Sequence, residues 1–157
     1  MKILALDPAT KCGWAHSGWG PHGATSGTWD LSIRRDESGG MRLIRLQSKL
    51  NAIAGAGLDL VVFEAARNAG PKMQGALVVQ SELQGVIKVW CEEKGIDYRG
   101  YSPSEIKKFA TGKGNANKPE MLAAANAEWP DVEIIDDNQA DAMWLLALVQ
   151  SELGGEA

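Results

Sequence analysis

Histidine and cysteine are scarce in this sequence of 157 residues. It contains two cysteines, Cys12 and Cys91, and two histidines, His16 and His22. The cysteines lack the spacing of a metal site. We therefore expect two buried free thiols in a reducing compartment, with a disulfide between them as the alternative. We expect the histidines at the surface or in a turn, because they flank a glycine-rich segment.

Long apolar runs are also missing. No uninterrupted run approaches the roughly 18 apolar residues that a membrane span requires. Met1-Lys2 lead straight into a short apolar segment, without the length or cleavage site of a secretory signal peptide. We therefore expect a cytoplasmic protein with no membrane partner. The length suits one hydrophobic core, so we predict a single domain over residues 1–157.

Basic residues are absent after Lys118. Residues 1–118 hold all 16 basic residues and 11 of the 20 acidic ones, for a net charge of +5. Residues 119–157 hold the other nine acidic residues and no basic one. The total of −4 argues against a nucleic-acid partner, but this asymmetry is compatible with a basic binding face on an acidic protein. An acidic end without a binding role is equally consistent with the charges.

The hydrophobic pattern predicts an α/β fold. We expect a mixed five-stranded sheet flanked by helices, because three early strands form a meander and two helical crossovers then give parallel strands. Trp14, Trp19 and Trp29 are expected to pack on the meander. The predicted strands are 2–7, 12–19, 24–31, 59–64 and 96–101, and the predicted helices are 41–54, 72–94, 102–112, 118–128 and 141–152.

Acidic residues stand where apolar segments end or begin. Asp7 and Glu64 each end an apolar run, and Asp136, Asp137 and Asp141 lie at the start of the last helix. A carboxylate is unfavourable there unless a cation offsets its charge. Oxygens delivered by two strand ends and one helix start suit Mg²⁺ or Mn²⁺, and two such ions can drive phosphodiester hydrolysis. Alternatively each acid is a loop or cap residue, with Asp136 or Asp137 as the helix N-cap.

A basic segment follows the fifth predicted strand. Gly112 and Gly114 allow its backbone to approach a ligand closely, and Asn115 and Asn117 can hydrogen-bond phosphates. Beside a carboxylate cluster, its lysines would stabilise the charge that develops on a scissile phosphate. These lysines are Lys107, Lys108, Lys113 and Lys118. The alternative is an exposed, mobile loop with solvated lysines.

Other basic residues are candidates for phosphate contacts along DNA. Arg42, Arg45 and Lys49 follow one another at helical spacing, which predicts one exposed stripe of the helix 41–54. Such a stripe is also typical of an ordinary solvated face. Arg67 and Lys72, which follow the second carboxylate, are further candidates.

These segments together resemble RuvC-type Holliday junction resolvases, which belong to the RNase H-like (retroviral integrase) superfamily. The run Ile3 to Pro8, with Gly13 downstream, resembles the first strand and first carboxylate of that family. Glu64 resembles its second carboxylate, and Asp141-Ala142 its last. Lys107 and Lys118, eleven residues apart around a Gly-x-Gly turn, resemble the family's pair of lysines. The resemblance covers essentially the whole chain.

The resemblance implies an RNase H-like fold and a Mg²⁺-dependent endonuclease, with Mn²⁺ as a substitute, that resolves four-way and other branched DNA. It implies two metal ions bridged by Asp7 and completed by Glu64 and Asp141, with Asn138 or Asp137 as a further ligand. It implies that Lys107 and Lys118 clamp the scissile phosphate. The cut would leave 5′-phosphates and serve DNA recombination and repair, in a bacterial cell or for a phage. A junction with two-fold symmetry implies a homodimer, with the helix 72–94 as its interface.

Two features depart from the family pattern. Many relatives carry an acid or a histidine where this chain has Asn138, so Asp137 is the alternative ligand. Bacterial members often carry an aromatic residue shortly after the second carboxylate, whereas here Ala65, Ala66 and Arg67 follow. Arg67 can take its place by stacking or by binding phosphate. The sequence preference at the cut and the strictness for four-way junctions are therefore left open.

Three other functions are compatible with parts of this sequence. The first is a related nuclease that acts on flaps, forks or RNA–DNA hybrids. The second is a non-catalytic junction-binding protein, which Asn138 favours and the intact Asp7, Glu64 and Asp141 oppose. The third, a sugar-kinase-like ATPase, requires two such halves, and this length provides only one.

Overall fold

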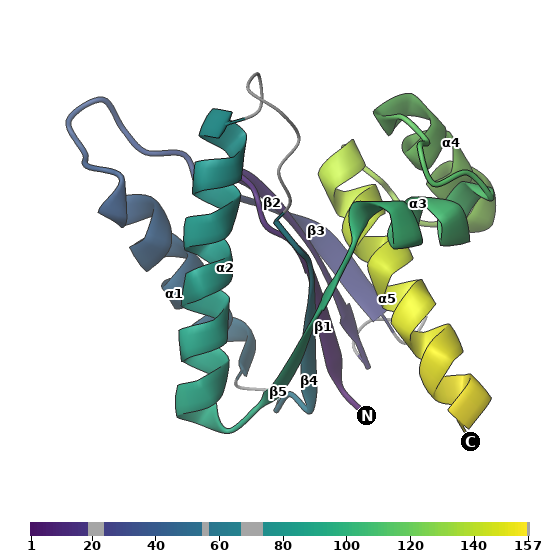
Figure 1. Cartoon of the computed structure of the whole chain (residues 1–157), viewed down its shortest axis with the longest axis horizontal. Coiled ribbons are helices and arrows are strands. Elements are labelled where there is room, and N and C mark those ends of the chain that lie inside the picture. Colours follow the sequence, from purple (N-terminus) through teal and green to yellow (C-terminus); the bar gives the residue numbers. More distant parts are fainter. Residues whose placement is uncertain (19–23, 55–56, 67–73, 157) are drawn as a thin grey trace.

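The computed structural model describes residues 1–18, 24–54, 57–66 and 74–156 (Figure 1). Every predicted strand and helix is confirmed, with ends shifted by a few residues; the last helix starts four residues earlier than predicted. The elements are β1 (Ile3–Asp7), β2 (Lys11–Ser17), β3 (Ala24–Asp30), α1 (Gly40–Ala54), β4 (Leu60–Glu64), α2 (Gln74–Lys94), β5 (Asp97–Tyr101), α3 (Pro103–Thr111), α4 (Lys118–Glu128) and α5 (Asp137–Glu156). No described helix is long and apolar enough to cross a membrane.

The strands form one mixed sheet in the order β3-β2-β1-β4-β5. β1 pairs antiparallel with β2, and β2 with β3, as expected of a meander. β1 and β5 both pair parallel with β4, because α1 and α2 carry the chain back to the starting edge between strands. The carboxyl ends of β1, β4 and β5 therefore lie at one edge of the sheet.

Helices cover both faces of the sheet (Figure 1). Alternate residues of β1 serve the two faces: Leu4 and Leu6 pack with α1 and α2, whereas Ile3 and Ala5 pack with α3, α4 and α5. Both clusters are made almost wholly of buried apolar side chains, so the sheet separates two hydrophobic layers. Since β1 and β4 are covered on both sides, any charged group at their ends is held against a low-dielectric interior.

The two helices of the basic segment are capped as their sequences require. Ser102 and Glu105 form a capping box at the start of α3, with Pro103 in the first turn, and α3 ends at Gly112 with a φ of 83°. Asn117 forms a second capping box with Glu120 at the start of α4. Phosphate binding by Asn117 stays a prediction, because the cap uses only its side-chain oxygen, which accepts the Glu120 amide, whereas a phosphate would accept from its side-chain NH₂ group.

The structure tests the burial predicted for the two cysteines and for His16. Cys12 and Cys91 are buried free thiols, as expected. His16 is fully buried rather than exposed, because it lies within β2, and burial lowers its pKa. Ile44 of α1 is apolar but 51% exposed, since it stands two residues from the buried Leu46 and so points the opposite way.

The meander tryptophans pack as predicted where they are described. Trp14 and Trp29 stack with their ring centroids 5.5 Å apart and their planes at 20°. Both rings pack against the apolar layer beneath α1 and α2. Trp19 and His22 lie outside the described residues.

At Gly13 of β2 the backbone of α5 comes very close to the sheet. A Cβ built on this residue would overlap the backbone carbonyl of Asn138, at the start of α5. Only glycine fits here without moving the helix, although the backbone conformation itself is ordinary.

We predict that Gly13→Ala lowers the free energy of unfolding by roughly 2–3 kcal/mol, because α5 must move away from β2. Chemical denaturation would measure the change. The matched control is Gly154→Ala near the end of α5, where a Cβ meets no atom within 4 Å. This control should change stability by less than about 1 kcal/mol, and an equally tolerated Gly13→Ala would contradict the close approach.

Candidate metal centre

Three carboxylates converge at one edge of the sheet. Asp7 ends β1 and Glu64 ends β4, and the pairing of Leu6 with Phe63 brings these strand ends side by side. Asp141 comes from α5, which packs across β1 and β2. One carboxylate oxygen from each of the three residues lies within 4.8 Å of the other two. The predicted convergence of two strand ends and one helix start is thus what the geometry shows.

The cluster holds more negative charge than its surroundings can accommodate. Burial raises the pKa of Asp7 well above its usual range, and the charge and hydrogen bond of the adjacent Glu64 raise it further. Burial likewise raises the pKa of Asp141 to about 7, with added repulsion from Glu64 and Asp137. At neutral pH the site therefore favours either a bound proton or a bound cation.

The donor set suits a hard divalent cation. Asp141 Oδ1 is buried and accepts no hydrogen bond from any described residue, so a ligating atom is available inside the cluster. The grouped atoms are all carboxylate oxygens, which Mg²⁺ and Mn²⁺ prefer. Cys12 lies close enough for Asp7 to affect it, but burial first and Asp7 second raise the pKa of its thiol, which makes it a poor ligand. The residues present fit a divalent-metal site.

The first residues of α5 separate into different roles. Asp136 is the N-cap, because its Oδ1 accepts the Gln139 amide at 2.8 Å. Asp137 carries a charge that reaches both Asp7 and Asp141, and its Oδ2 lies 3.8 Å from Lys118 Nζ. Asn138 lines a groove beside the loop after β1, with Thr10 and Lys11 among its neighbours. The participation of Asp137 or Asn138 as a further ligand stays a prediction.

Two lysines of the basic segment stand beside the cluster. The charges of Lys107, on α3, and Lys118, at the start of α4, both act to lower the pKa of Asp141. Lys118 is 82% exposed, so its ammonium group is accessible to a ligand. Lys113 forms an ion pair with Glu120 instead. Lys108 and Asn115 are exposed on the same segment.

The basic stripe expected on α1 is only partly exposed. Lys49 is exposed, but Arg42 and Arg45 are half-buried. Arg45 donates to Glu37 Oε2 at 2.6 Å and to the carbonyl of Ser32 at 3.0 Å. The predicted exposed stripe is therefore wrong for the two arginines, and for Arg45 the cause is its contact with the loop before α1. Arg67 and Lys72 lie outside the described residues, and DNA contact by all five remains a prediction.

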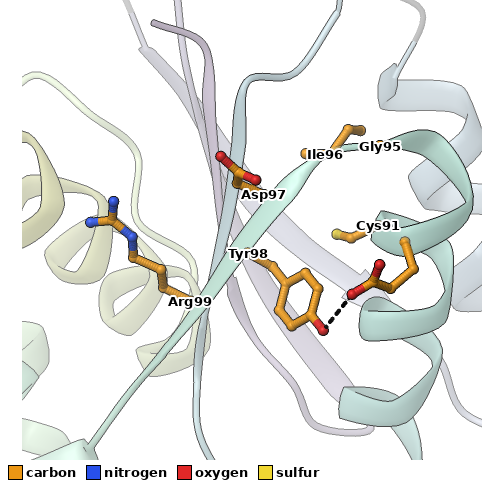
Figure 2. Close-up of a pocket in the computed structure, with 7 residues that line it drawn as sticks. Cys91, Gly95, Ile96, Asp97, Tyr98 and Arg99 are labelled. Atoms are coloured by element: carbon orange, nitrogen blue, oxygen red, sulfur yellow. Dashed lines mark hydrogen bonds between the residues drawn. The ribbon is translucent and has the colours of Figure 1, made fainter.

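A shallow pocket elsewhere on the molecule has no part in this site. It lies at the turn from α2 into β5, where Tyr98 Oη donates to Glu92 Oε1 at 3.0 Å (Figure 2). Asp97 there begins β5 and pairs with the first residue of β4, whereas Glu64 ends β4. The pocket is consequently at the opposite edge of the sheet from the carboxylates.

Two side chains near the site were not singled out in the sequence. Thr28 of β3 donates to Asp136 Oδ1 at 2.8 Å, and Gln139 donates to Ser26 Oγ at 3.0 Å. Gln139 has a recognisable signal, since it stands three residues after the N-cap, as in a capping box. Thr28 has none, because its partner is 108 residues away in the sequence.

Comparison with known proteins supports the resemblance seen in the sequence. No family model matches the chain. The crossover junction endodeoxyribonuclease RuvC of Sphingopyxis alaskensis is 27% identical over 151 residues, which cover 91% of this chain and 92% of the relative. That of Brachyspira hyodysenteriae is 38% identical over 63 residues, or 40% of this chain and 39% of the relative.

Solved structures of RuvC share the fold. Thermus thermophilus RuvC in complex with a Holliday junction substrate superimposes with a TM-score of 0.71 at 19% identity, covering 92% of this chain and 89% of that one. A second structure of T. thermophilus RuvC gives a TM-score of 0.67 over 92% and 90% of the two chains, also at 19% identity. The RNase H-like fold and the similarity to RuvC-type proteins are therefore confirmed.

The raised pKa of Asp141 predicts how stability depends on pH without metal. Below about pH 4 the carboxyl is protonated in both folded and unfolded states. Between about pH 4 and pH 7 it ionises only in the unfolded state, so the folded protein loses stability progressively, and the loss is complete above about pH 7. Asp141→Asn removes this loss, so the metal-free variant should gain up to about 4 kcal/mol over the wild type between pH 4 and pH 8.

Denaturation of both proteins across this pH range, with chelator, tests the prediction. Adding Mn²⁺ at pH 8 should stabilise the wild type more than Asp141→Asn, because the variant has lost one of the clustered carboxylates. Parallel pH profiles for the two proteins would show that Asp141 is not held in a repulsive environment.

Proposed function

We propose that this chain, similar to RuvC proteins in sequence and in fold, is a Mg²⁺-dependent endonuclease that resolves Holliday junctions and other branched DNA. The observation that carries the proposal is the cluster of Asp7, Glu64 and Asp141, with Lys107 and Lys118 beside it. Products with 5′-phosphates, and a role in recombination and repair in the bacterial cytoplasm, go with this function. A phage origin is compatible with it.

The chain's own residues hold the reactants in place. Asp7, Glu64 and Asp141 would ligate the divalent ions, with Asp137 or Asn138 as a further ligand. When bound, two Mg²⁺ ions supply activation of a water molecule and neutralisation of the leaving oxygen.

The lysines beside the cluster would bind the scissile phosphate. Lys118 would exchange its contact with Asp137, now 3.8 Å long, for the DNA. Lys107 stands on the other helix of the segment and would neutralise the same phosphate, so that its charge does not oppose the approach of the nucleophile.

Further polar and basic groups are proposed to contact the DNA away from the scissile phosphate. Lys108 and Asn115 are exposed beside the two proposed phosphate-binding lysines, and Lys49 is exposed on α1. These groups would contact phosphates of the junction arms without reading sequence. Lys113, Arg42, Arg45, Arg67 and Lys72 complete the proposed set of DNA contacts.

A four-way junction presents two equivalent strands for cleavage, so the proposal includes a homodimer. Val78, Gly85 and Val89 lie on one face of α2 at spacings of seven and four residues, and both valines are more than half exposed. Val89 and Ile44 of α1 line a groove of about 500 Å³ between the two helices. A glycine between two exposed valines allows a second helix to approach closely, which favours α2 as the interface.

The cleavage prediction is direct. With Mg²⁺, the wild type should nick an immobile, end-labelled four-way junction symmetrically on two strands. Asp7→Asn should abolish cutting but bind the junction nearly as well, because the lysines that contact phosphate are unchanged. Gel analysis of the products, with Ca²⁺ as the non-catalytic metal, measures both properties.

The same assay separates the rival functions. A flap, a fork and an RNA–DNA hybrid, supplied in parallel, identify a related nuclease if one of them is cut faster than the junction. Tight binding of the junction without cutting by the wild type would indicate a non-catalytic binding protein. Wild-type cutting rates for Asp7→Asn would contradict the metal centre itself.

The dimer proposal predicts that Val89→Glu is monomeric at concentrations where the wild type is a dimer. A buried, unpaired glutamate on each side of the interface opposes association. Sedimentation velocity measures the change. Ile135→Glu is the matched control, because Ile135 is 65% exposed but lies in the segment before α5 and does not line the groove between α1 and α2. A dimeric Val89→Glu, or a monomeric wild type, would refute this interface.

A further inference from the structure

Asp141 is the one carboxylate of the cluster that the sheet does not carry. Asp7 and Glu64 end neighbouring strands, and the parallel pairing of β1 with β4 sets their separation. Asp141 belongs to a helix in another layer (Figure 1). Its distance from the other two therefore depends on how the first turns of α5 are fixed against the sheet.

Hydrogen bonds fix that part of α5 to β3. Asp136 Oδ1 accepts both the hydroxyl of Thr28 and the backbone amide of Gln139, each at 2.8 Å. Gln139 is 3% exposed and donates to Ser26 Oγ at 3.0 Å and to the Glu133 carbonyl at 3.1 Å. Ser26 and Thr28 stand two residues apart, so they lie on the same face of β3.

The sheet register places these bonds level with the carboxylates. Gly13 is paired with Asp7 on one side and with Thr28 on the other. The three residues form one row across β1, β2 and β3, and Glu64 follows in the next strand. Above this row the helix backbone at Asn138 rests directly on Gly13. The hydroxyl of Thr28 is thus at the end of the row that holds the metal-binding groups.

We propose that Thr28 is a positioning residue, which acts through Asp136 to hold Asp141 at ligating distance from Asp7 and Glu64. The inference rests on the proposed function. Because Gly13 has no side chain, α5 can rest directly on the backbone of β2. The hydrogen bond between Thr28 and Asp136 then keeps α5 from moving away from the sheet. Ser26 and Gln139 reinforce the same attachment further along β3.

Because Thr28 acts through its hydroxyl donor, substitutions that keep or remove this donor should differ in their effect. Thr28→Val keeps the shape of the side chain but removes the donor, whereas Thr28→Ser keeps the donor. Loss of a hydrogen bond made directly to a metal ligand lowers metal affinity or activity by about 10-fold to 100-fold, and Thr28 acts one residue further out, so we expect the lower end of that range. Thr28→Val should therefore bind Mn²⁺ about 10-fold more weakly than the wild type, and Thr28→Ser should restore binding. Ser26→Ala should have a smaller effect, since Ser26 reaches only Gln139.

The test is a calorimetric titration of the metal-free full-length protein with Mn²⁺, without DNA. Single-turnover cleavage of the junction at saturating protein is measured beside it, together with junction affinity and the midpoint of thermal unfolding. Thr25→Val is the matched control, because Thr25 is on the same strand but its hydroxyl makes no contact with Asp136. We expect Thr28→Val to lose Mn²⁺ affinity and cleavage rate together while junction affinity and Thr25→Val stay at wild-type values.

The outcomes distinguish the two proposals. A Thr28→Val protein with wild-type Mn²⁺ affinity overturns the positioning role, including the case where only its unfolding midpoint falls. Reduced Mn²⁺ affinity in Thr28→Val, rescued in Thr28→Ser, supports that role even if the wild type cuts no junction, in which case only the proposed function fails. A wild type that binds no Mn²⁺ overturns both.

Discussion

Mutual repulsion among three carboxylates at the edge of a buried sheet is the constraint on which this structure depends. Burial and the charge of Glu64 raise the pKa of both Asp7 and Asp141, so the ionised form of each carboxylate is unfavourable in the folded protein. Such a cluster is stabilised by a proton or by a cation. The absence of nitrogen and sulfur ligands from the grouped atoms selects a hard cation, and this directs the chemistry towards phosphate.

The fold holds the three repelling carboxylates in place through backbone pairing and through contacts of α5 with the sheet. Two carboxylates are carried by adjacent parallel strands, where backbone pairing sets their spacing. The third is carried by a helix that is fixed from below by Gly13 and from the side by Thr28. Side chains that repel one another need such support, because without it they would turn away towards solvent.

The fold brings residues from the basic and the acidic parts of the sequence together. Lys107 and Lys118 belong to the positive part of the chain, and Asp137 and Asp141 belong to the part that has no basic residue. In the folded chain the two groups face each other, and the lysines partly offset the acids in the absence of DNA. A net charge of −4 is therefore no obstacle to binding a polyanion, since the local field at the site decides the interaction.

The sequence by itself determined the α/β class, the order of the elements and the identity of the three clustered carboxylates. These features depend on local periodicity and on where apolar runs end. Only the tertiary structure decided that His16 is buried, that Arg45 is held by Glu37, and that Thr28 reaches Asp136. Each of these depends on where a side chain meets another layer or a loop that folds back over it. No local pattern encodes a contact between residues 108 positions apart, whereas the packing of α5 on β2 and β3 brings it about directly.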